Sequence, residues 1–382
     1  MPSQASDIVV RGASSVVDPV EALRLALSEA AKAMAGHGAT PGDILAMTWT
    51  ALRPATIHPA QPVVDLTLRE IFGGIRPPID LQFSDHDGVR VELQLRQPIA
   101  PSLDPVWRGL SMSELARTYS PRSTVSDMGA IFDAWRREGA AFRSTHLTAE
   151  LAYGPSHGEA LDLYLPKAAT SAAPLWLFIH GGYWQAIDKE QNAHFAAGMF
   201  EAGYAVAMLN YTLAPFASLA EILAQTQRAI TFLSREAKAL GCNPDEIHIS
   251  GHSAGGHLVA MIAAVPEGKL IRSCLPLSGI FDIEPLARLP MGRMLRLDTA
   301  DEIARLSPQN FKPLPHVRIG VAVGGNESRE FQRQSTDYAA HCGGAPCRIV
   351  AGKNHFDLLD GLNGGELLDF ALEIAAIGRR AT

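Results

Sequence analysis

The sequence is poor in several features that mark particular classes of protein. It has 382 residues with four cysteines, 19% charged residues, 7% aromatic residues and a formal net charge of −7. No long basic run is present, which argues against a nucleic-acid partner. No apolar run is long enough to cross a membrane, and the first residues lack the basic and apolar segments of a secretory signal. We therefore expect a cytoplasmic protein without nucleic-acid or membrane partners.

The few cysteines also lack the spacing of a metal site. They are Cys242, Cys274, Cys342 and Cys347. Reduced cysteines are typical of the cytoplasm, so we expect free thiols, with a Cys342–Cys347 bridge as the alternative. No motif implies a metal or a cofactor, and we expect neither.

What the chain does have is enough apolar residues for a large core. They make up 47% of the sequence, and its length favours two domains. Residues 1–98 predict a small α+β domain with strands at 43–52, 79–84 and 89–97 and helices at 19–34 and 61–72. Asp85-His86-Asp87-Gly88 indicates a hairpin turn between the last two strands. Pro98, Pro101 and Pro105 indicate a linker over residues 99–110.

From residue 111 to residue 382, strands and helices alternate. An all-apolar strand at 175–179 is typical of a parallel sheet that is buried on both faces. We expect helices between the later strands, which lie at 205–210, 246–250, 274–277, 318–323 and 347–350. This order predicts an α/β fold with a mostly parallel, doubly wound sheet.

The most informative motif is a G-x-S-x-G sequence. It consists of Gly251, His252, Ser253, Ala254 and Gly255. An apolar strand leads into it and a helix at about 254–264 leads out, which is the context that a nucleophile elbow requires. Glycines on both sides allow the sharp turn that presents the serine oxygen. The motif therefore predicts a serine hydrolase.

A serine nucleophile needs a histidine base and an orienting carboxylate, which follow it in that order in this kind of fold. Among the histidines after Ser253, only His355 follows the last predicted strand, at the tip of a loop. Glu327 lies just after the strand at 318–323, where a carboxylate would leave the sheet. We predict Ser253, Glu327 and His355 as the catalytic residues. Glu330 stays open as an alternative acid.

The turn after the 175–179 strand carries a second motif, His180-Gly181-Gly182-Tyr183-Trp184. Glycine lets a backbone approach the substrate closely, so we predict that Gly181, Gly182 and Ala254 provide the N–H groups of an oxyanion hole.

We assign three neighbouring residues, Tyr183, Trp184 and His252, to the substrate pocket. Packing in the core is the alternative for the aromatic residues. The apolar segment 279–311 is the candidate lid.

These motifs together resemble the kynurenine formamidase branch of the α/β-hydrolases, over about residues 111–382. The match includes His180–Trp184, Gly251–Leu258, Glu327–Ser335 and His355–Asp357. The resemblance implies an α/β-hydrolase fold and the same three catalytic residues. Carboxylesterases of the branch share these motifs, so both formamides and short acyl esters stay open as substrates.

Residues 8–98 resemble the reactive-intermediate deaminases, also called the RidA-like family. The match is carried by Gly36–Asp43 and Leu68–Pro78. The substrate-binding arginine of that family aligns with Ile79, so the clamp for a substrate carboxylate is missing unless Arg76 replaces it. We expect an inactive domain that serves oligomerisation, hence a homo-oligomer. The alternative is a coupled enzyme, in which the hydrolase cleaves an N-acyl enamine and this domain handles the released enamine.

Overall fold

The computed structural model describes residues 8–14, 19–36, 44–51, 79–83, 89–95, 106–166 and 172–376. The chain forms two compact units: residues 1–113 group with 286–298, and residues 114–285 group with 299–382. We call them unit 1 and unit 2. The domain limits expected from the sequence, 1–98, 99–110 and 111–382, stay a prediction. Within the described residues, no helix is long and apolar enough to cross a membrane.

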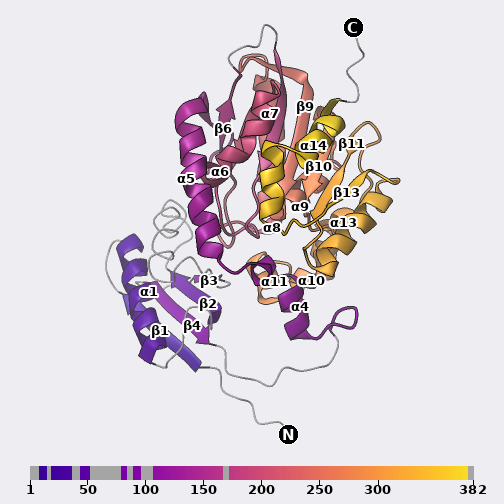
Figure 1. Cartoon of the computed structure of the whole chain (residues 1–382). Coiled ribbons are helices and arrows are strands. Elements are labelled where there is room, and N and C mark those ends of the chain that lie inside the picture. Colours follow the sequence, from indigo (N-terminus) through magenta and orange to yellow (C-terminus); the bar gives the residue numbers. More distant parts are fainter. Residues whose placement is uncertain are drawn as a thin grey trace. The chain divides into compact units, whose positions relative to one another are not determined.

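Unit 1 contains a four-stranded sheet of the order β1-β4-β2-β3 with helix α1 packed on β1 and β4 (Figure 1). On α1, Ala26, Leu27 and Ala30 are buried, which gives the helix one apolar face. The elements are β1 Ile8–Ser14, α1 Pro19–Gly36, β2 Ile44–Ala51, β3 Ile79–Phe83 and β4 Val89–Leu95. The helix expected at 61–72 lies outside the described residues.

The hairpin expected between 79–84 and 89–97 is wrong. β3 pairs with β2 in parallel, and β4 pairs with β2 on its other edge in an antiparallel manner, so β2 lies between them. A strand has two hydrogen-bonding edges, and a turn sequence does not determine which neighbour each edge takes. β4 uses its second edge to pair with β1.

Unit 2 is built on a sheet whose strands follow the order β13-β12-β10-β9-β7-β8-β6-β5, with β11 also paired to β10. In this sheet order, each neighbouring pair between β13 and β8 is parallel. The last two pairs, β6–β8 and β5–β6, are antiparallel. This confirms the expected α/β fold with a mostly parallel sheet. The strands are β5 Ala149–Ala152, β6 Ala160–Tyr164, β7 Ala173–Ile179, β8 Ala205–Leu209, β9 Cys242–His252, β10 Ser273–Leu277, β11 Arg318–Ile319, β12 Val321–Gly324 and β13 Cys347–Val350.

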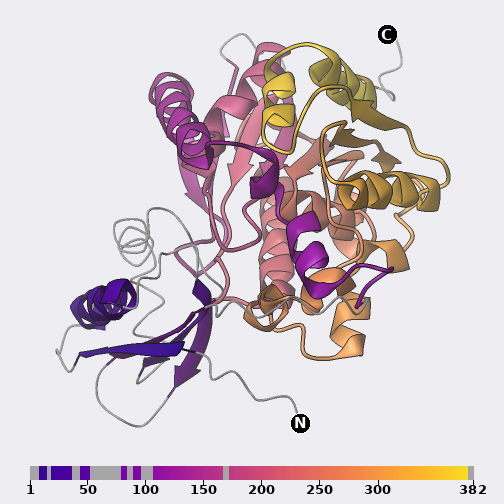
Figure 2. The same cartoon turned by 60° about the horizontal axis from the view of Figure 1, so that its bottom comes forward.

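Helices cover both faces of this sheet (Figure 1 and Figure 2). The helix expected near 191–202 is broken into α6, a 3₁₀ turn and α7. The described helices after residue 111, of which α11 lies in unit 1, are α4 Met112–Thr118, η3 Pro121–Thr124, α5 Met128–His146, α6 Lys189–Asn192, η4 Ala193–Ala196, α7 Ala197–Glu201, α8 Leu219–Glu236, α9 Ala254–Ile262, η5 Pro266–Leu270, α10 Glu284–Ala287, α11 Pro290–Met294, α12 Ala300–Arg305, η6 Pro308–Asn310, α13 Arg329–His341, η7 Asp357–Asn363 and α14 Glu366–Ala376. The segment 279–311 thus contains three short α-helices and the 3₁₀ helix η6, and its role as a lid stays a prediction.

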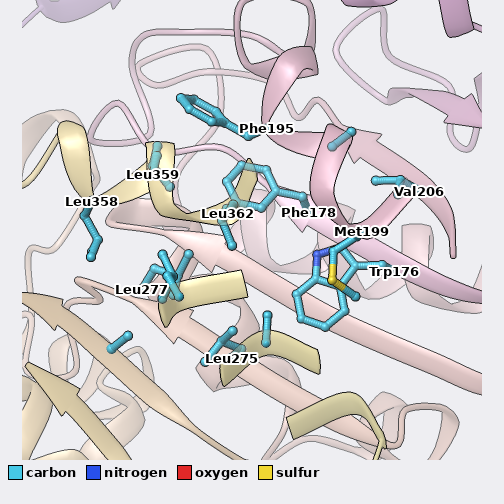
Figure 3. Close-up of a cluster of buried hydrophobic side chains, with 14 of the residues drawn as sticks. Trp176, Phe178, Phe195, Met199, Val206, Leu275, Leu277, Leu358, Leu359 and Leu362 are labelled. Atoms are coloured by element: carbon cyan, nitrogen blue, oxygen red, sulfur yellow. The ribbon is translucent and has the colours of Figure 1, made fainter. Parts of the chain in front are cut away.

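The core on one face of the sheet shows why the central strands are apolar throughout. Trp176 and Phe178 of β7 lie in a cluster with Leu275 and Leu277 of β10 and with side chains of α7 and η7 (Figure 3). The intervening residues of β7 are equally buried. Burial of this apolar area fixes the sheet, and with it the loops at the carboxyl ends of the parallel strands.

Candidate active site

Ser253 lies on a tight turn between β9 and α9. Its φ of 55° is in the left-handed region, where few residues other than glycine are found, so the backbone is strained at this residue. A Cβ on Gly251 would lie 2.4 Å from the oxygen of Gly255, and a Cβ on Gly255 would lie 2.0 Å from the oxygen of Ile179. Both glycines are therefore required, because the strand, the turn and the helix approach so closely. This geometry is that of a nucleophile elbow.

The turn after β7 lies against this elbow. A Cβ on Gly181 would lie 3.2 Å from the Cβ of Ser253 and 3.0 Å from the oxygen of His252. Gly182 has a φ of 91°, and a Cβ there would lie 2.0 Å from the oxygen of Ala186. Ala254 is the first residue of α9, where a backbone N–H has no acceptor within the helix. The three residues predicted for the oxyanion hole therefore lie next to Ser253 or belong to the turn that contacts it.

Glu327 and His355 meet in the interior. His355 Nδ1 lies 2.6 Å from Oε2 of Glu327, and the two residues are only 3% and 6% exposed. Oε1 of Glu327 accepts hydrogen bonds from the N–H of Gly324 at 2.7 Å and from the hydroxyl of Ser278 at 2.5 Å. The carboxylate is therefore held on both oxygens, and one of them is directed at the imidazole. Such a bond fixes the orientation and tautomer of a histidine.

His355 also lies beside the elbow. Its ring centroid is 4.5 Å from that of His252, the residue that precedes Ser253. The ring centroid of Phe331, a residue of α13, lies 4.8 Å from that of His355. The structure therefore brings together the parts of the chain that carry the three predicted catalytic residues.

Glu330, the alternative acid, has other partners. It forms an ion pair with Arg333 at 2.8 Å and accepts a hydrogen bond from the hydroxyl of Tyr119 at 3.0 Å. The carboxylate that accepts the hydrogen bond from Nδ1 of His355 is that of Glu327.

Ser278 is a site residue that the sequence analysis missed. It follows β10 with a φ of 48°, a conformation that is uncommon for serine. Its hydroxyl donates to Glu327, which lies 49 positions further along the chain. A serine directly after a strand whose neighbour carries the nucleophile is a signal that could have indicated this residue.

The three residues assigned to the substrate pocket lie in different surroundings. Trp184 is fully buried, with its ring edge-on to His257 at 5.1 Å. Tyr183 is partly exposed and donates a hydrogen bond from its hydroxyl to the backbone oxygen of Tyr119. His252 contacts the ring of His355, as described above. Their role in substrate binding stays a prediction.

Several histidines near the elbow are held in the neutral form. Burial lowers the pKa of His180 and of His257 to about 4. Burial, together with the neighbouring His355, lowers the pKa of His252 well below 6.5. His180 stacks on Tyr211, and its Nδ1 pairs with the oxygen of Gly181 at 2.9 Å. It therefore supports the turn.

From the sequence, we expect the four cysteines and the potential metal ligands of the described residues to form no metal site. All four cysteines are free, as expected. Among the described residues, no group of three or more His, Cys, Asp or Glu side chains is arranged to hold a metal ion.

Comparisons with known proteins show similarity to hydrolases. The family model BD-FAE matches residues 161–276, which include the elbow and the Gly181–Gly182 turn. The kynurenine formamidase of Danio rerio is 28% identical over 295 residues, which cover 72% of this chain and 99% of the relative.

Solved structures extend the similarity. A putative thioesterase from Silicibacter sp. TM1040 is 31% identical with a TM-score of 0.60, and the match covers 66% of this chain and 96% of that chain. Esterase LipW from Mycobacterium marinum has a TM-score of 0.53 at 19% identity over 68% of this chain and 90% of its own. This last similarity is one of fold.

The buried histidines predict a loss of stability in acid. The folded-state pKa of His257 is about 4, below the ordinary value of about 6.5, so the unfolded chain takes up a proton first as the pH falls. The stability is present above about pH 6.5 and decreases towards pH 4. For His257 alone, we expect a loss of about 2 kcal/mol in the free energy of unfolding between roughly pH 7 and pH 5.

Urea unfolding of the wild type and of His257→Gln at these pH values measures the effect. The variant should lose that part of the pH dependence. The control is His157→Gln at an exposed position, which should keep the wild-type slope. Equal slopes for His257→Gln and the wild type would contradict the assignment.

Proposed function

Because the chain is an enzyme of the α/β-hydrolase family, we propose that it is a serine hydrolase that cleaves an aryl formamide or an ester through an acyl-enzyme on Ser253. The observation that carries the proposal is the buried Glu327–His355 hydrogen bond of 2.6 Å beside a strained elbow. Serine is a poor nucleophile near neutral pH, and a base that is oriented in this way supplies what it lacks.

In the proposed mechanism, His355 removes the proton of Ser253 as the hydroxyl oxygen attacks the carbonyl carbon. The backbone N–H groups of Ala254 and of Gly181 or Gly182 stabilise the negative charge on the carbonyl oxygen. His355 then protonates the leaving amine or alcohol, and the acyl group stays on Ser253. A water molecule, activated by His355, releases the acid and restores the serine. Throughout, Glu327 holds the imidazole and offsets its transient charge.

The aryl formamide is supported by the relative from Danio rerio, which is named a kynurenine formamidase and of which this chain covers 99%. An ester is the second candidate, because the solved relative at 31% identity is described as a putative thioesterase. Both reactions need the same nucleophile, base and oxyanion hole. They differ in the acyl group that is transferred to Ser253, in the leaving group, and in the pocket that holds them.

Steady-state kinetics separate the two substrates. We expect N-formylkynurenine to give a larger kcat/KM than p-nitrophenyl acetate or butyrate, and Ser253→Ala to reduce every activity by at least about 10³-fold. Strong ester cleavage with negligible formamide cleavage would assign the protein to the carboxylesterases. Activity that persists in Ser253→Ala would refute the mechanism.

The acid can be identified with a matched pair of variants, Glu327→Gln and Glu330→Gln. Glutamine at 327 removes the charge beside His355 and can stabilise the wrong tautomer, so kcat should fall about 10³- to 10⁴-fold. Glutamine at 330 can still accept the hydrogen bond from Tyr119, and kcat should change less than about tenfold. The reverse order of effects would make Glu330 the acid.

A further inference from the structure

We propose that Gln334 is a positioning residue that holds Glu327 and Ser278 in register with the nucleophile elbow. The inference rests on the proposed function, because its effect would be exerted through the Glu327–His355 pair. Gln334 lies on α13, the helix that follows Glu327, and is only 3% exposed. Gln334 takes no direct part in the mechanism proposed above. Its role therefore has to come from its hydrogen bonds.

The Gln334 side chain uses all of its hydrogen-bonding capacity. Its oxygen accepts the backbone N–H groups of Phe281 at 2.7 Å and of Asp282 at 2.9 Å. Its nitrogen donates to the hydroxyl of Tyr119 at 2.7 Å and to the backbone oxygen of Asp282 at 3.2 Å. A primary amide offers two donors and two acceptor sites, so each one is taken. Among side chains, only asparagine also provides this set in one plane, and it is one methylene shorter.

The loop that Gln334 holds connects the acid to the elbow. This loop, residues 278–282, begins at Ser278, whose hydroxyl donates to Glu327. A Cβ on Gly256 of α9 would lie 2.9 Å from the Cα of Gly279, so the loop runs directly against the elbow helix. The ring of Phe281 stacks on Tyr338 of α13 at 4.1 Å. A shift of this loop would therefore move Ser278 relative to both Glu327 and α9.

A second connection passes through Tyr119. Its hydroxyl accepts from Gln334 and donates to Glu330, while its backbone oxygen accepts the hydroxyl of Tyr183. Tyr183 directly follows Gly182 in the turn that is proposed for the oxyanion hole. Gln334 therefore ties the acid side of the site to the turn after β7.

Loss of the amide would leave the buried N–H groups of Phe281 and Asp282 without acceptors. The free energy lost in this way is large enough to shift the loop. A misplacement of about 1 Å near reacting groups can reduce a rate about 100-fold. We expect little change in substrate binding, because the hydrogen bonds of Gln334 go to Phe281, Asp282 and Tyr119, and none goes to a residue assigned to the substrate pocket. The expected signature is a loss of kcat with little change in KM.

The test uses Gln334→Met, which is close in shape and lacks the amide. We expect kcat on the preferred substrate to fall about 10- to 100-fold with KM within about twofold, and the rate of inactivation by a fluorophosphonate to fall by the same factor. Tyr119→Phe removes one of the four bonds and should give a smaller loss in the same direction. Tyr119→Phe also replaces Gln334→Met as the test variant if Gln334→Met does not fold.

The control is Gln225→Leu. Gln225 is similarly buried, and its oxygen accepts the backbone N–H of Thr212 at 2.7 Å. This variant should lose stability but keep kcat and the inactivation rate at temperatures well below unfolding. Wild-type kcat and inactivation rates in folded Gln334→Met, or in Tyr119→Phe if the former does not fold, would overturn the inference. A wild-type protein that forms no adduct on Ser253 would instead refute the proposed function, and the inference with it.

Discussion

The hydrogen bond between Glu327 and His355 is the interaction on which the proposed site depends. Glu327 follows β12 and His355 follows β13, and these neighbouring parallel strands bring the two side chains to the same edge of the sheet. Burial makes the bond strong and makes its loss costly, because a buried carboxylate without a partner is unfavourable. The N–H of Gly324 and the hydroxyl of Ser278 stabilise the carboxylate further.

The other half of the site is held by close backbone approaches. The N–H of Ser253 donates to the oxygen of Leu277 at 2.8 Å, and the hydroxyl of Ser278, the residue after Leu277, donates to Glu327. The end of β10 thus connects Ser253 to Glu327. Gly181 and Gly255 let the turn after β7 and the helix α9 approach Ser253 closely. Preorganisation of this kind is what a serine hydrolase needs, since the dipoles are in place before the reaction begins.

Much of unit 2 could be predicted from the sequence, because apolar runs mark the central strands and this kind of fold places serine, acid and histidine in a fixed order along the chain. Ser278 was missed, although its place directly after β10 could have indicated it. Gln334 could not be predicted, because its partner Phe281 lies 53 positions away in the chain. The pairing of β3 and β4 with β2 could not be predicted either, because a local turn sequence does not specify strand neighbours. The deaminase resemblance, the homo-oligomer and the cytoplasmic location stay predictions.

The central claim is that this fold activates one serine, and covalent labelling tests it most directly. The full-length protein is treated with a fluorophosphonate, and its intact mass and labelled peptides are measured. The account predicts one adduct per chain, on Ser253, with no label on the protein after denaturation before treatment. An adduct on another residue, or no adduct on the folded protein, would contradict it.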